Sequence, residues 1–279
     1  MKTNSIAAVV LTLNEEPNIQ RCLASLQWCD LVVVLDSGSE DNTKSEALRL
    51  EAEFFLHKQM PPFKIDKQRN WALDNCGIEH EWVLFLDADE TVPDALRDEI
   101  LRCCDPEHCT DYNAYELTPR YLFWGTWLKR TQGYPNWHPR LLKPKEVRFT
   151  GGVWEHFDEN AIIGKIEAPY DHYANSKGFS DWLDRHDRYS SWDAEKIVNF
   201  LESKSADSLN TTRKLELRLL AARLWPLRPL ARFIYMYFGR LGFLEGRASF
   251  VFCLLYAYYE FMTVVKIIEL KRTRKGLPL

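Results

Sequence analysis

Residues 82–94 read W-V-L-F-L-D-A-D-E-T-V-P-D, an apolar run that ends in two aspartates one residue apart. The run Val83–Leu86 is typical of a buried strand, which gives rigid support to whatever follows it. At its carboxyl end, Asp87 and Asp89 present two carboxylates above the sheet. Hard divalent cations such as Mg²⁺ bind one or two carboxylates together with substrate phosphates. The stretch therefore predicts a metal-assisted reaction on a phosphorylated substrate.

The first half of the chain alternates short apolar runs with segments of helical spacing. This alternation predicts an α/β fold with a mostly parallel sheet that is covered by helices on both faces. The expected strands cover residues 6–13, 31–35, 53–56 and 82–86, and the expected helices cover residues 17–26, 43–50 and 65–76.

Polar clusters follow three of the expected strands. Asn14-Glu15-Glu16 follows the first strand, Asp36-Ser37-Gly38 the second, and Asp87-Ala88-Asp89 the fourth. Ligands of parallel sheets bind beyond the carboxyl ends of the strands, so we expect the three clusters to share one site. The coincidence of three clusters is a stronger signal than any one of them.

The pattern changes after about residue 110. Residues 112–172 are rich in aromatic residues, Gly and Pro, which indicates one or two hairpins and an irregular region of the kind that carries a second substrate. Helical patterns follow at residues 179–203, 230–244 and 248–270. We predict one domain over residues 1–210, with a donor half at 1–110 and an acceptor half at 111–210, and then a helical tail at 211–279.

The composition is that of a globular protein, because 46% of the residues are hydrophobic and 27% are charged. Aromatic residues make up 13% of the chain, a high share that sugar-binding and membrane-interface proteins both favour. Seven cysteines without a C-x-x-C motif, and a start at residues 1–14 that lacks the features of an export signal, favour free thiols in a reducing cytosol.

The net charge of −4 hides a split along the chain. Residues 211–279 contain 13 Lys and Arg but 4 Asp and Glu, a balance of +9, which leaves 23 and 36 in residues 1–210, a balance of −13. A basic tail predicts an anionic partner. Its basic residues are interleaved with long apolar runs and no nucleic-acid-binding module is visible, so we expect an anionic membrane surface and no nucleic acid.

The tail predicts burial at a membrane interface, or a partial dip into one leaflet, rather than a full span. Residues 248–268 are nearly apolar, but they contain Glu260 and Lys266, and charges near the centre of a spanning helix are costly. The basic residues would contact anionic headgroups while the apolar residues enter the headgroup boundary. The alternative is an ordinary pair of helices packed on the body of the protein.

Two other interpretations of the D-x-D compete with a metal site. Residues 87–92, D-A-D-E-T-V, also fit the first motif of haloacid-dehalogenase-like phosphatases, in which the first aspartate, here Asp87, is the nucleophile. That fold normally starts with this strand and needs a downstream acidic pair, whereas about 80 residues precede the strand here and no such pair follows. The second reading is a solvated turn after a buried strand.

The three strand-end motifs together resemble glycosyltransferase family 2, which has the Rossmann-like GT-A fold. They are L-T-L-N-E-E at residues 11–16, V-V-V-L-D-S-G-S-E-D-N-T at 32–43, and L-F-L-D-A-D-E at 84–90, in the family's order and spacing. The resemblance covers about the first 110 residues. It implies a nucleotide-sugar donor, a divalent cation (Mg²⁺ or Mn²⁺) and inversion at the anomeric carbon.

The resemblance also implies roles for individual residues. Asp36 would hydrogen-bond the base, Asp87 would lie near the ribose, and Asp89 would bind the metal on the diphosphate. Arg69, in a family-like Arg-Asn pair, would contact the diphosphate, because a guanidinium suits phosphate oxygens. The alternative for Arg69 is an exposed helix residue. The residues assigned to the donor are Leu13, Asn14, Glu15, Asp36, Arg69, Asp87 and Ala88.

Transfer requires a base within hydrogen-bond reach of the acceptor hydroxyl. The resemblance implies that this base lies downstream of the D-x-D. The candidate is Glu155 in G-G-V-W-E-H at residues 151–156. A subgroup that includes lipopolysaccharide-core glucosyltransferases typically reads V-H-E here, so the Trp before Glu155 departs from its pattern. The departure leaves His156 as a rival base.

Two further segments resemble the same subgroup. His172, in P-Y-D-H-Y at residues 169–173, matches a His-Tyr pattern and is assigned to the metal shell, with a structural histidine as the alternative. The segment R-L-G-F-L-E-G-R at residues 240–247 resembles tails of enzymes that act on lipid-linked acceptors.

The sequence thus predicts an inverting glycosyltransferase with a GT-A core and a C-terminal amphipathic helical region that associates with a membrane. Its donor would be a nucleotide sugar, most simply a UDP-linked hexose. Its acceptor would be a lipid-linked glycan or lipopolysaccharide core at the cytoplasmic face of a bacterial inner membrane, where the protein is peripheral. The alternatives are the phosphatase that uses Asp87 and a catalytically inactive membrane adaptor.

Overall fold

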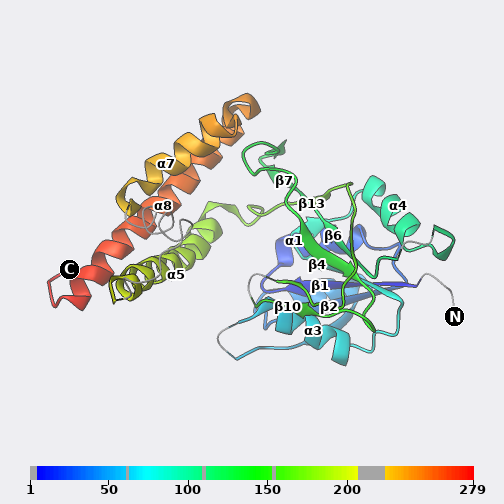
Figure 1. Cartoon of the computed structure of the whole chain (residues 1–279). Coiled ribbons are helices and arrows are strands. Elements are labelled where there is room, and N and C mark those ends of the chain that lie inside the picture. The colour runs from blue at the N-terminus through cyan, green and yellow to red at the C-terminus, as the bar shows by residue number, and fades with distance from the viewer. Residues whose placement is uncertain (1–4, 61–62, 109–110, 153–154, 207–223) are drawn as a thin grey trace. The chain divides into compact units, whose positions relative to one another are not determined.

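The computed structural model describes residues 5–60, 63–108, 111–152, 155–206 and 224–279. The chain forms two compact units, one from residues 1–122 and 134–176 and the other from residues 123–133 and 177–279 (Figure 1). The expected domain boundary at residue 210 lies outside the described residues, so the division at that position stays a prediction. The six described cysteines are free thiols.

The first unit contains a seven-stranded, mostly parallel sheet in the order β12-β6-β9-β4-β1-β2-β3, which confirms the predicted α/β class. The four strands predicted in the first half are β1 to β4, and every pairing among them is parallel. Strand β9 is antiparallel to both β4 and β6. The strands are β1 (Ile6–Thr12), β2 (Leu31–Asp36), β3 (Glu53–Leu56), β4 (Trp82–Asp87), β6 (Ala114–Leu117), β9 (His138–Leu142) and β12 (Ile163–Lys165).

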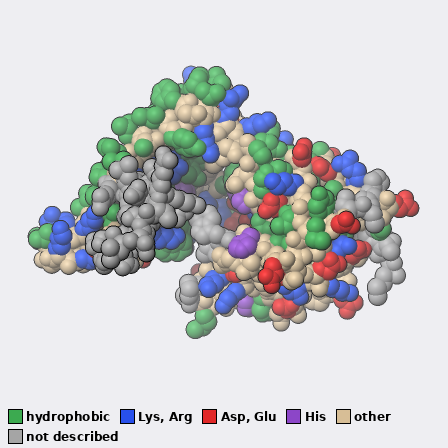
Figure 2. Space-filling model, in the orientation of Figure 1, with side chains coloured by type: hydrophobic (Ala, Val, Ile, Leu, Met, Phe, Trp, Pro, Cys, Tyr) green, Lys and Arg blue, Asp and Glu red, His purple; other side chains and the backbone are tan. Residues whose placement is uncertain are grey.

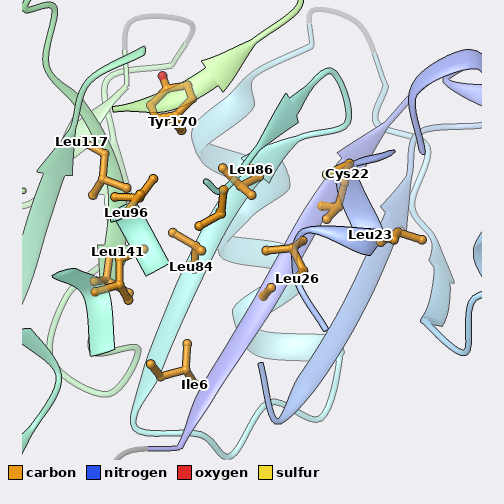
Figure 3. Packing of buried hydrophobic residues seen from close by; sticks show 14 of the residues in the cluster. Ile6, Cys22, Leu23, Leu26, Leu84, Leu86, Leu96, Leu117, Leu141 and Tyr170 are labelled. Carbon is orange, nitrogen blue, oxygen red and sulfur yellow. The ribbon is translucent and has the colours of Figure 1, made fainter. Parts of the chain in front are cut away.

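Alternate residues of the strands point to opposite faces of this sheet. Both faces are apolar, and helices cover both of them. On one face, Leu84 and Leu86 of β4 pack with side chains of α1 and α4 (Figure 3). On the other face, Val83 and Phe85 pack with side chains of α3. The helices are α1 (Glu16–Ala24), α2 (Thr43–Arg49), α3 (Ile65–Asn75), α4 (Asp94–Cys103) and the 3₁₀ turn η1 (Pro106–His108).

Short strands complete the first unit near the end of β4. Strand β13 pairs antiparallel with β5 and parallel with β7, and β10 pairs antiparallel with β11. The β13–β5 pairing sets His172 opposite Glu90, directly after the D-x-D. These strands are β5 (Glu90–Thr91), β7 (Pro119–Phe123), β10 (Phe149–Thr150), β11 (His156–Phe157) and β13 (Tyr170–His172).

The second unit is helical, and α8 packs against both α5 and α7. The prediction of one helix over residues 230–244 is wrong, because α7 ends at Ile234, a π-helical turn follows, and Leu241 adopts a left-handed φ of 58°. The elements are β8 (Thr126–Trp127), α5 (Gly178–Ala206), η2 (Trp225–Leu227), α7 (Arg228–Ile234), η3 (Tyr235–Gly239), η4 (Gly242–Glu245) and α8 (Gly246–Arg274).

Candidate functional site

The carboxyl ends of β1, β2 and β4 meet at one edge of the sheet, as the sequence predicts. In the register of β1, Thr12 lies opposite Asp36 of β2, and Leu11 lies opposite Asp87 of β4. Ala88 continues this alignment, because its buried backbone N–H donates to the carbonyl of Leu11 over 3.3 Å. The edge therefore gathers residues that are 24 to 77 positions apart in the chain.

Asp36 organises the loop that follows β2. Its Oδ1 accepts hydrogen bonds from the backbone N–H groups of Gly38 (2.8 Å) and Ser39 (2.7 Å), and its Oδ2 accepts from the hydroxyls of Thr12 (2.8 Å) and Ser39 (2.5 Å). Gly38 has a φ of 107°, which a glycine adopts without strain. Asp36 is 2% exposed, and its carboxylate accepts these four hydrogen bonds from within the protein. Its contact with a base stays a prediction.

The loop after β1 is tied to the same structure. The backbone N–H of Asn14 donates to the Ser39 hydroxyl over 2.7 Å, and the Asn14 side chain accepts from the backbone of Glu40 over 2.8 Å. Glu15 donates its backbone N–H to the first side chain of α2 over 2.8 Å. Leu13 is half exposed beside them. The loops after β1 and β2 thus form one rigid rim, and donor contacts by Leu13, Asn14 and Glu15 stay predictions.

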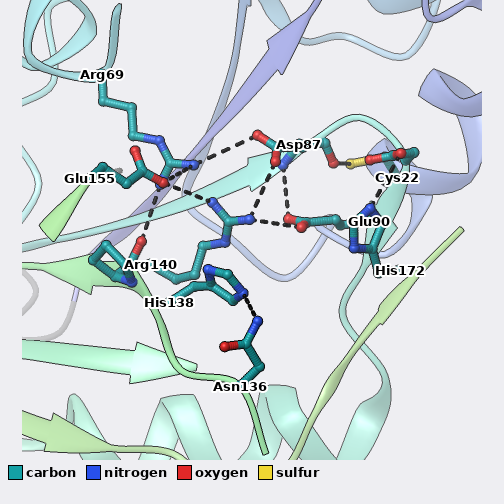
Figure 4. Close-up of polar contacts among 11 residues, drawn as sticks. Cys22, Arg69, Asp87, Glu90, Asn136, His138, Arg140, Glu155 and His172 are labelled. Carbon is teal, nitrogen blue, oxygen red and sulfur yellow. Dashed lines mark hydrogen bonds and ion pairs between the residues drawn. The ribbon is translucent and has the colours of Figure 1, made fainter. Parts of the chain in front are cut away.

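Two buried arginines and three carboxylates form a charge cluster next to this rim (Figure 4). Arg69 of α3 lies 3.0 Å from Glu155 Oε1 and 3.7 Å from Asp87 Oδ1. Arg140 of β9 lies 2.7 Å from Glu90 Oε1, 3.3 Å from Asp87 Oδ2 and 3.7 Å from Glu155 Oε1. The cluster brings together three residues that the sequence assigned to one site, namely Arg69, Asp87 and Glu155.

Several buried polar atoms of this cluster have no hydrogen-bond partner among the described residues. They are Nε of Arg69, Nε and Nη1 of Arg140, and Oε2 of Glu155. Buried polar atoms are normally hydrogen-bonded, so such a group calls for an explanation. The guanidinium N–H groups match an anion, and the carboxylate oxygen matches a hydroxyl donor. The unpartnered atoms thus have the chemistry to receive a phosphorylated substrate and an alcohol.

Burial changes the proton affinities of this site. Burial raises the pKa of Glu155, and the charges of Arg69 and Arg140 oppose that rise. Burial likewise raises the pKa of Glu90, with Arg140 opposing it. Burial and, to a smaller extent, the charge of Arg140 lower the pKa of His138 to about 4. A carboxylate with a raised pKa is the stronger base, so Glu155 has the properties of a proton acceptor.

Asp89 and His172 lie side by side, as the predicted metal ligands should. Nε2 of His172 is 3.4 Å from Oδ2 of Asp89. Two ligands that bind one octahedral cation at about 2.1 Å lie about 3 Å apart, so this spacing fits a shared ion. Burial lowers the pKa of His172, but the charge and hydrogen bond of Asp89 together with the charges of Glu90 and Asp87 outweigh burial, so the pKa lies above its ordinary value.

Among the described residues, no group of three or more His, Cys, Asp or Glu side chains is arranged to hold a metal ion. A cation that takes one or two protein ligands and completes its shell with substrate phosphates needs no such group. Asp89 and His172 therefore fit Mg²⁺ or Mn²⁺ bound together with a diphosphate. Their metal role stays a prediction.

Sequence reasoning missed Glu90 and Arg140. The register of β9 against β4 sets Leu141 opposite Leu84, which carries Arg140 toward Asp87. An arginine directly before the apolar pair Leu141-Leu142 was the available signal, but the pairing partner could not be read from the chain. Val153 and Trp154, which precede Glu155 in the expected motif, lie outside the described residues, and the rival base His156 is exposed on β11.

Replacement of Arg140 should destabilise the fold strongly. Arg140→Met leaves buried Glu90 without its ion-pair partner, so we expect the free energy of unfolding to fall by about 3–5 kcal/mol in denaturant titrations. The matched control is Arg49→Met in α2, where the distance to Glu46 is also 2.7 Å but the pair is solvent-exposed. That loss should stay within about 1 kcal/mol. An equal fall in the free energy of unfolding in the two variants would refute the claim that the buried ion pair of Arg140 and Glu90 supports the fold.

Comparison with known proteins identifies the first unit. Residues 7–150 match the family described as Glycosyl transferase family 2. Over 95% of this chain and 87% of the relative, the sequence is 26% identical to an uncharacterized glycosyltransferase of Rickettsia typhi. It is 31% identical over 105 residues, 36% of this chain and 38% of the relative, to the lipopolysaccharide core biosynthesis glycosyltransferase LpsC of Rhizobium meliloti.

A similar solved structure is glucosyl-3-phosphoglycerate synthase from Mycobacterium tuberculosis, in complex with Mn²⁺, uridine diphosphate and glucosyl-3-phosphoglycerate. The identity is 17%, the TM-score is 0.43, and the alignment covers 65% of this chain and 75% of that one.

Proposed function

The chain belongs to glycosyltransferase family 2, and from that membership we propose that it is an inverting, metal-dependent hexosyltransferase. It transfers a sugar from a nucleotide donor, UDP-linked in this proposal, to the hydroxyl of a glycolipid acceptor. The observation that carries the proposal is Glu155, which is ion-paired through Oε1 and has an unpartnered Oε2 beside two buried arginines.

Glu155 acts as the general base. The acceptor hydroxyl donates its hydrogen bond to Oε2, and the proton moves to that oxygen as the hydroxyl oxygen attacks the anomeric carbon. The bond between that carbon and the diphosphate breaks on the opposite face, so the configuration inverts. Arg69 holds the other oxygen of Glu155 at 3.0 Å, which fixes the carboxylate in one orientation. The base is thus positioned before the substrates bind.

The diphosphate is held by positive charge at the same edge of the sheet. Arg69 and Arg140 offer N–H groups that lack other hydrogen-bond partners among the described residues. Asp89 and His172 would hold Mg²⁺ or Mn²⁺, which acts as a Lewis acid that neutralises the developing charge on the leaving diphosphate. Asp87 lies between the arginines and is assigned to the ribose side, and the rim around Asp36 is assigned to the base.

The acidic limb of the pH–rate profile tests the role of Glu155. The base must be ionised, and burial raises its pKa, so kcat/KM for the acceptor should fall toward low pH with a midpoint above about 4.3, the ordinary value for Glu. Arg69→Gln removes a charge that lowers this pKa, so the midpoint should move upward. An unchanged or lower midpoint in Arg69→Gln would argue against Glu155 as the titrating base.

The acceptor in this proposal is lipid-linked, at the cytoplasmic face of a bacterial inner membrane. Three observations support it: relatives named as glycosyltransferases occur in bacteria, one of them is named for lipopolysaccharide core biosynthesis, and the tail carries a net charge of +9. The phosphatase alternative is set aside because the family match covers Asp87 together with the three strands that precede it.

Nucleotide binding tests the proposal without knowledge of the acceptor. We expect UDP with Mn²⁺ to raise the melting temperature, since a ligand at 100 times its Kd stabilises a protein by about 2.7 kcal/mol. UDP with EDTA should have a much smaller effect, and GDP or CMP with Mn²⁺ tests the choice of base. No stabilisation by any nucleotide with metal would leave the inactive adaptor as the better account.

A further inference from the structure

One face of α8 is apolar and exposed along most of the helix. Its residues recur at intervals of three and four, which places them on a single side. Each is between 37% and 53% exposed in the described structure. We call these residues the apolar stripe: Phe250, Leu254, Tyr258, Phe261, Val265 and Ile268.

Glu260 lies on the buried side of α8, Lys266 lies beside the stripe, and both are paired within the unit. Glu260 is 1% exposed and forms ion pairs with Arg228 (2.5 Å) and Arg232 (2.8 Å). Lys266 forms an ion pair with Asp187 of α5 over 2.6 Å. The two charges that make a membrane helix costly are therefore neutralised by protein partners.

An ordinary amphipathic helix buries one apolar side and exposes its charges. Helix α8 also buries apolar residues, among them Phe252, Val264 and Ile267, but it exposes the apolar stripe as well. Segment 227–238, which contains α7, repeats this exposure, because Leu227, Leu230, Ile234 and Phe238 are exposed at the same spacing. Figure 2 shows hydrophobic side chains gathered over the part of the unit that α7 and α8 form. Exposed apolar surfaces of this extent mark sites of interaction with lipid or protein.

The ends of the stripe identify its partner. Arg247 lies three residues before Phe250, and Arg272 lies four residues after Ile268, so both fall on the stripe's own face, and both are exposed. From Phe250 to Ile268 the helix rises about 27 Å. A long apolar face between two arginines matches acyl chains between anionic headgroups. A second copy of the chain would bring like charges together at both ends.

We infer that the helical unit lies flat on an anionic bilayer, with the apolar stripe buried at the headgroup boundary of one leaflet. A transmembrane orientation conflicts with α5, although the helical stretch Gly242–Arg274 is long and apolar enough to span a membrane. Helix α5 packs along α8 and exposes Asp184, Arg188, Glu195 and Lys196. A span would drag these charges into hydrocarbon, whereas an in-plane orientation leaves them in water.

Segment 123–133 belongs to the same membrane-facing unit. Glu245, before α8, accepts hydrogen bonds from the backbone N–H groups of Arg130 (2.5 Å) and Thr131 (3.0 Å). Phe123 packs on Phe252 with ring centroids 5.3 Å apart. The next residue, Trp124, is 72% exposed, and tryptophan is a preferred side chain at membrane interfaces. The membrane surface thus extends beyond the predicted tail at 211–279.

This inference deepens the proposed function, which already places the acceptor in a membrane. Flotation of the full chain with vesicles, without donor or acceptor, tests it separately from transfer. We expect binding to vesicles of phosphatidylcholine and phosphatidylglycerol at 7:3 and much weaker binding to phosphatidylcholine alone. Absence of vesicle binding would overturn this inference and leave the transferase proposal standing. Binding of vesicles without binding of any nucleotide would support this inference and contradict the transferase proposal.

Substitutions assign binding to the stripe. The double variant Leu254→Glu, Val265→Glu should bind the anionic vesicles at least about tenfold more weakly, because it puts two charges into the buried face. The control is Leu48→Glu in α2, an equally exposed leucine outside the unit, which should bind like the unchanged protein. Circular dichroism verifies that both variants keep their helices. Unchanged vesicle binding by the double variant, or a loss of dimerisation instead of lipid binding, would overturn the assignment.

Protease protection distinguishes the in-plane orientation from a span. An epitope tag placed after Leu279 should be removed by protease added outside sealed vesicles, because both ends of α8 stay on the same side. A tag that is protected until detergent is added would show that α8 crosses the bilayer and would overturn the in-plane orientation.

Discussion

Glu155→Gln should lower kcat by about 10²–10⁴-fold, the range that general base catalysis contributes. Glutamine keeps the size of the side chain and an oxygen that Arg69 can contact at its present 3.0 Å, but it cannot take up the proton of the acceptor hydroxyl. Because we assign the donor to other residues, the affinity for UDP with Mn²⁺ should change little. Steady-state rates and nucleotide titrations measure the two effects separately.

His156→Gln is the matched control for this prediction, since His156 is the rival base and the next residue in the chain. It lies exposed on β11, outside the cluster of Arg69, Arg140 and Asp87, so its replacement should leave kcat within a few-fold of the unchanged enzyme. The opposite pattern, a large loss in His156→Gln and a small one in Glu155→Gln, would assign the base to the histidine.

Asp89→Ala should reduce transfer by at least about 10³-fold, because metal stabilisation of the leaving diphosphate supplies several kcal/mol. The aspartate lies 3.4 Å from His172, so the variant removes the carboxylate of the only pair in the described structure that we assign to the metal. The fold should persist, because Asp89 lies at a strand end. The measurement is the transfer rate as a function of Mn²⁺ concentration, with thermal unfolding as a check on the fold.

Asp94→Ala is the control for the loss of a carboxylate, since Asp94 lies five residues further along and its side chain is 89% exposed. Its rate and metal dependence should equal those of the unchanged enzyme. If Asp89→Ala kept its full rate and its response to Mn²⁺, the metal assignment would be wrong, while the roles of Glu155 and Arg69 would still stand.

Much of the first unit was predictable because its signals are local. The apolar runs that become β1, β2 and β4 are each followed by polar residues, and parallel strands bring such ends to one edge. Glu155 and His172 came from resemblance to a family. The structure sets Glu155 3.0 Å from Arg69 and His172 3.4 Å from Asp89.

The rest depends on contacts between distant parts of the chain. Arg140 reaches Asp87 because β9 runs antiparallel beside β4, and nothing near residue 140 encodes that register. The pairing of Glu260 with Arg228 and Arg232 could not be predicted from the sequence either. The sequence therefore indicated an uncompensated charge within an apolar helix, whereas the structure pairs Glu260 with two arginines. Local patterns predicted elements and strand ends, whereas partners of buried charges required the fold.

The central claim is that this chain transfers a sugar with inversion, and one measurement tests it most directly. The full chain is incubated with a panel of nucleotide sugars, Mn²⁺ and a lipopolysaccharide-core acceptor, and the anomeric configuration of the product is determined by NMR. We predict a glycosylated acceptor with the configuration opposite to that of the donor, and no product in EDTA. Retention of configuration, or phosphate release through an aspartyl-phosphate trapped on Asp87, would contradict the account.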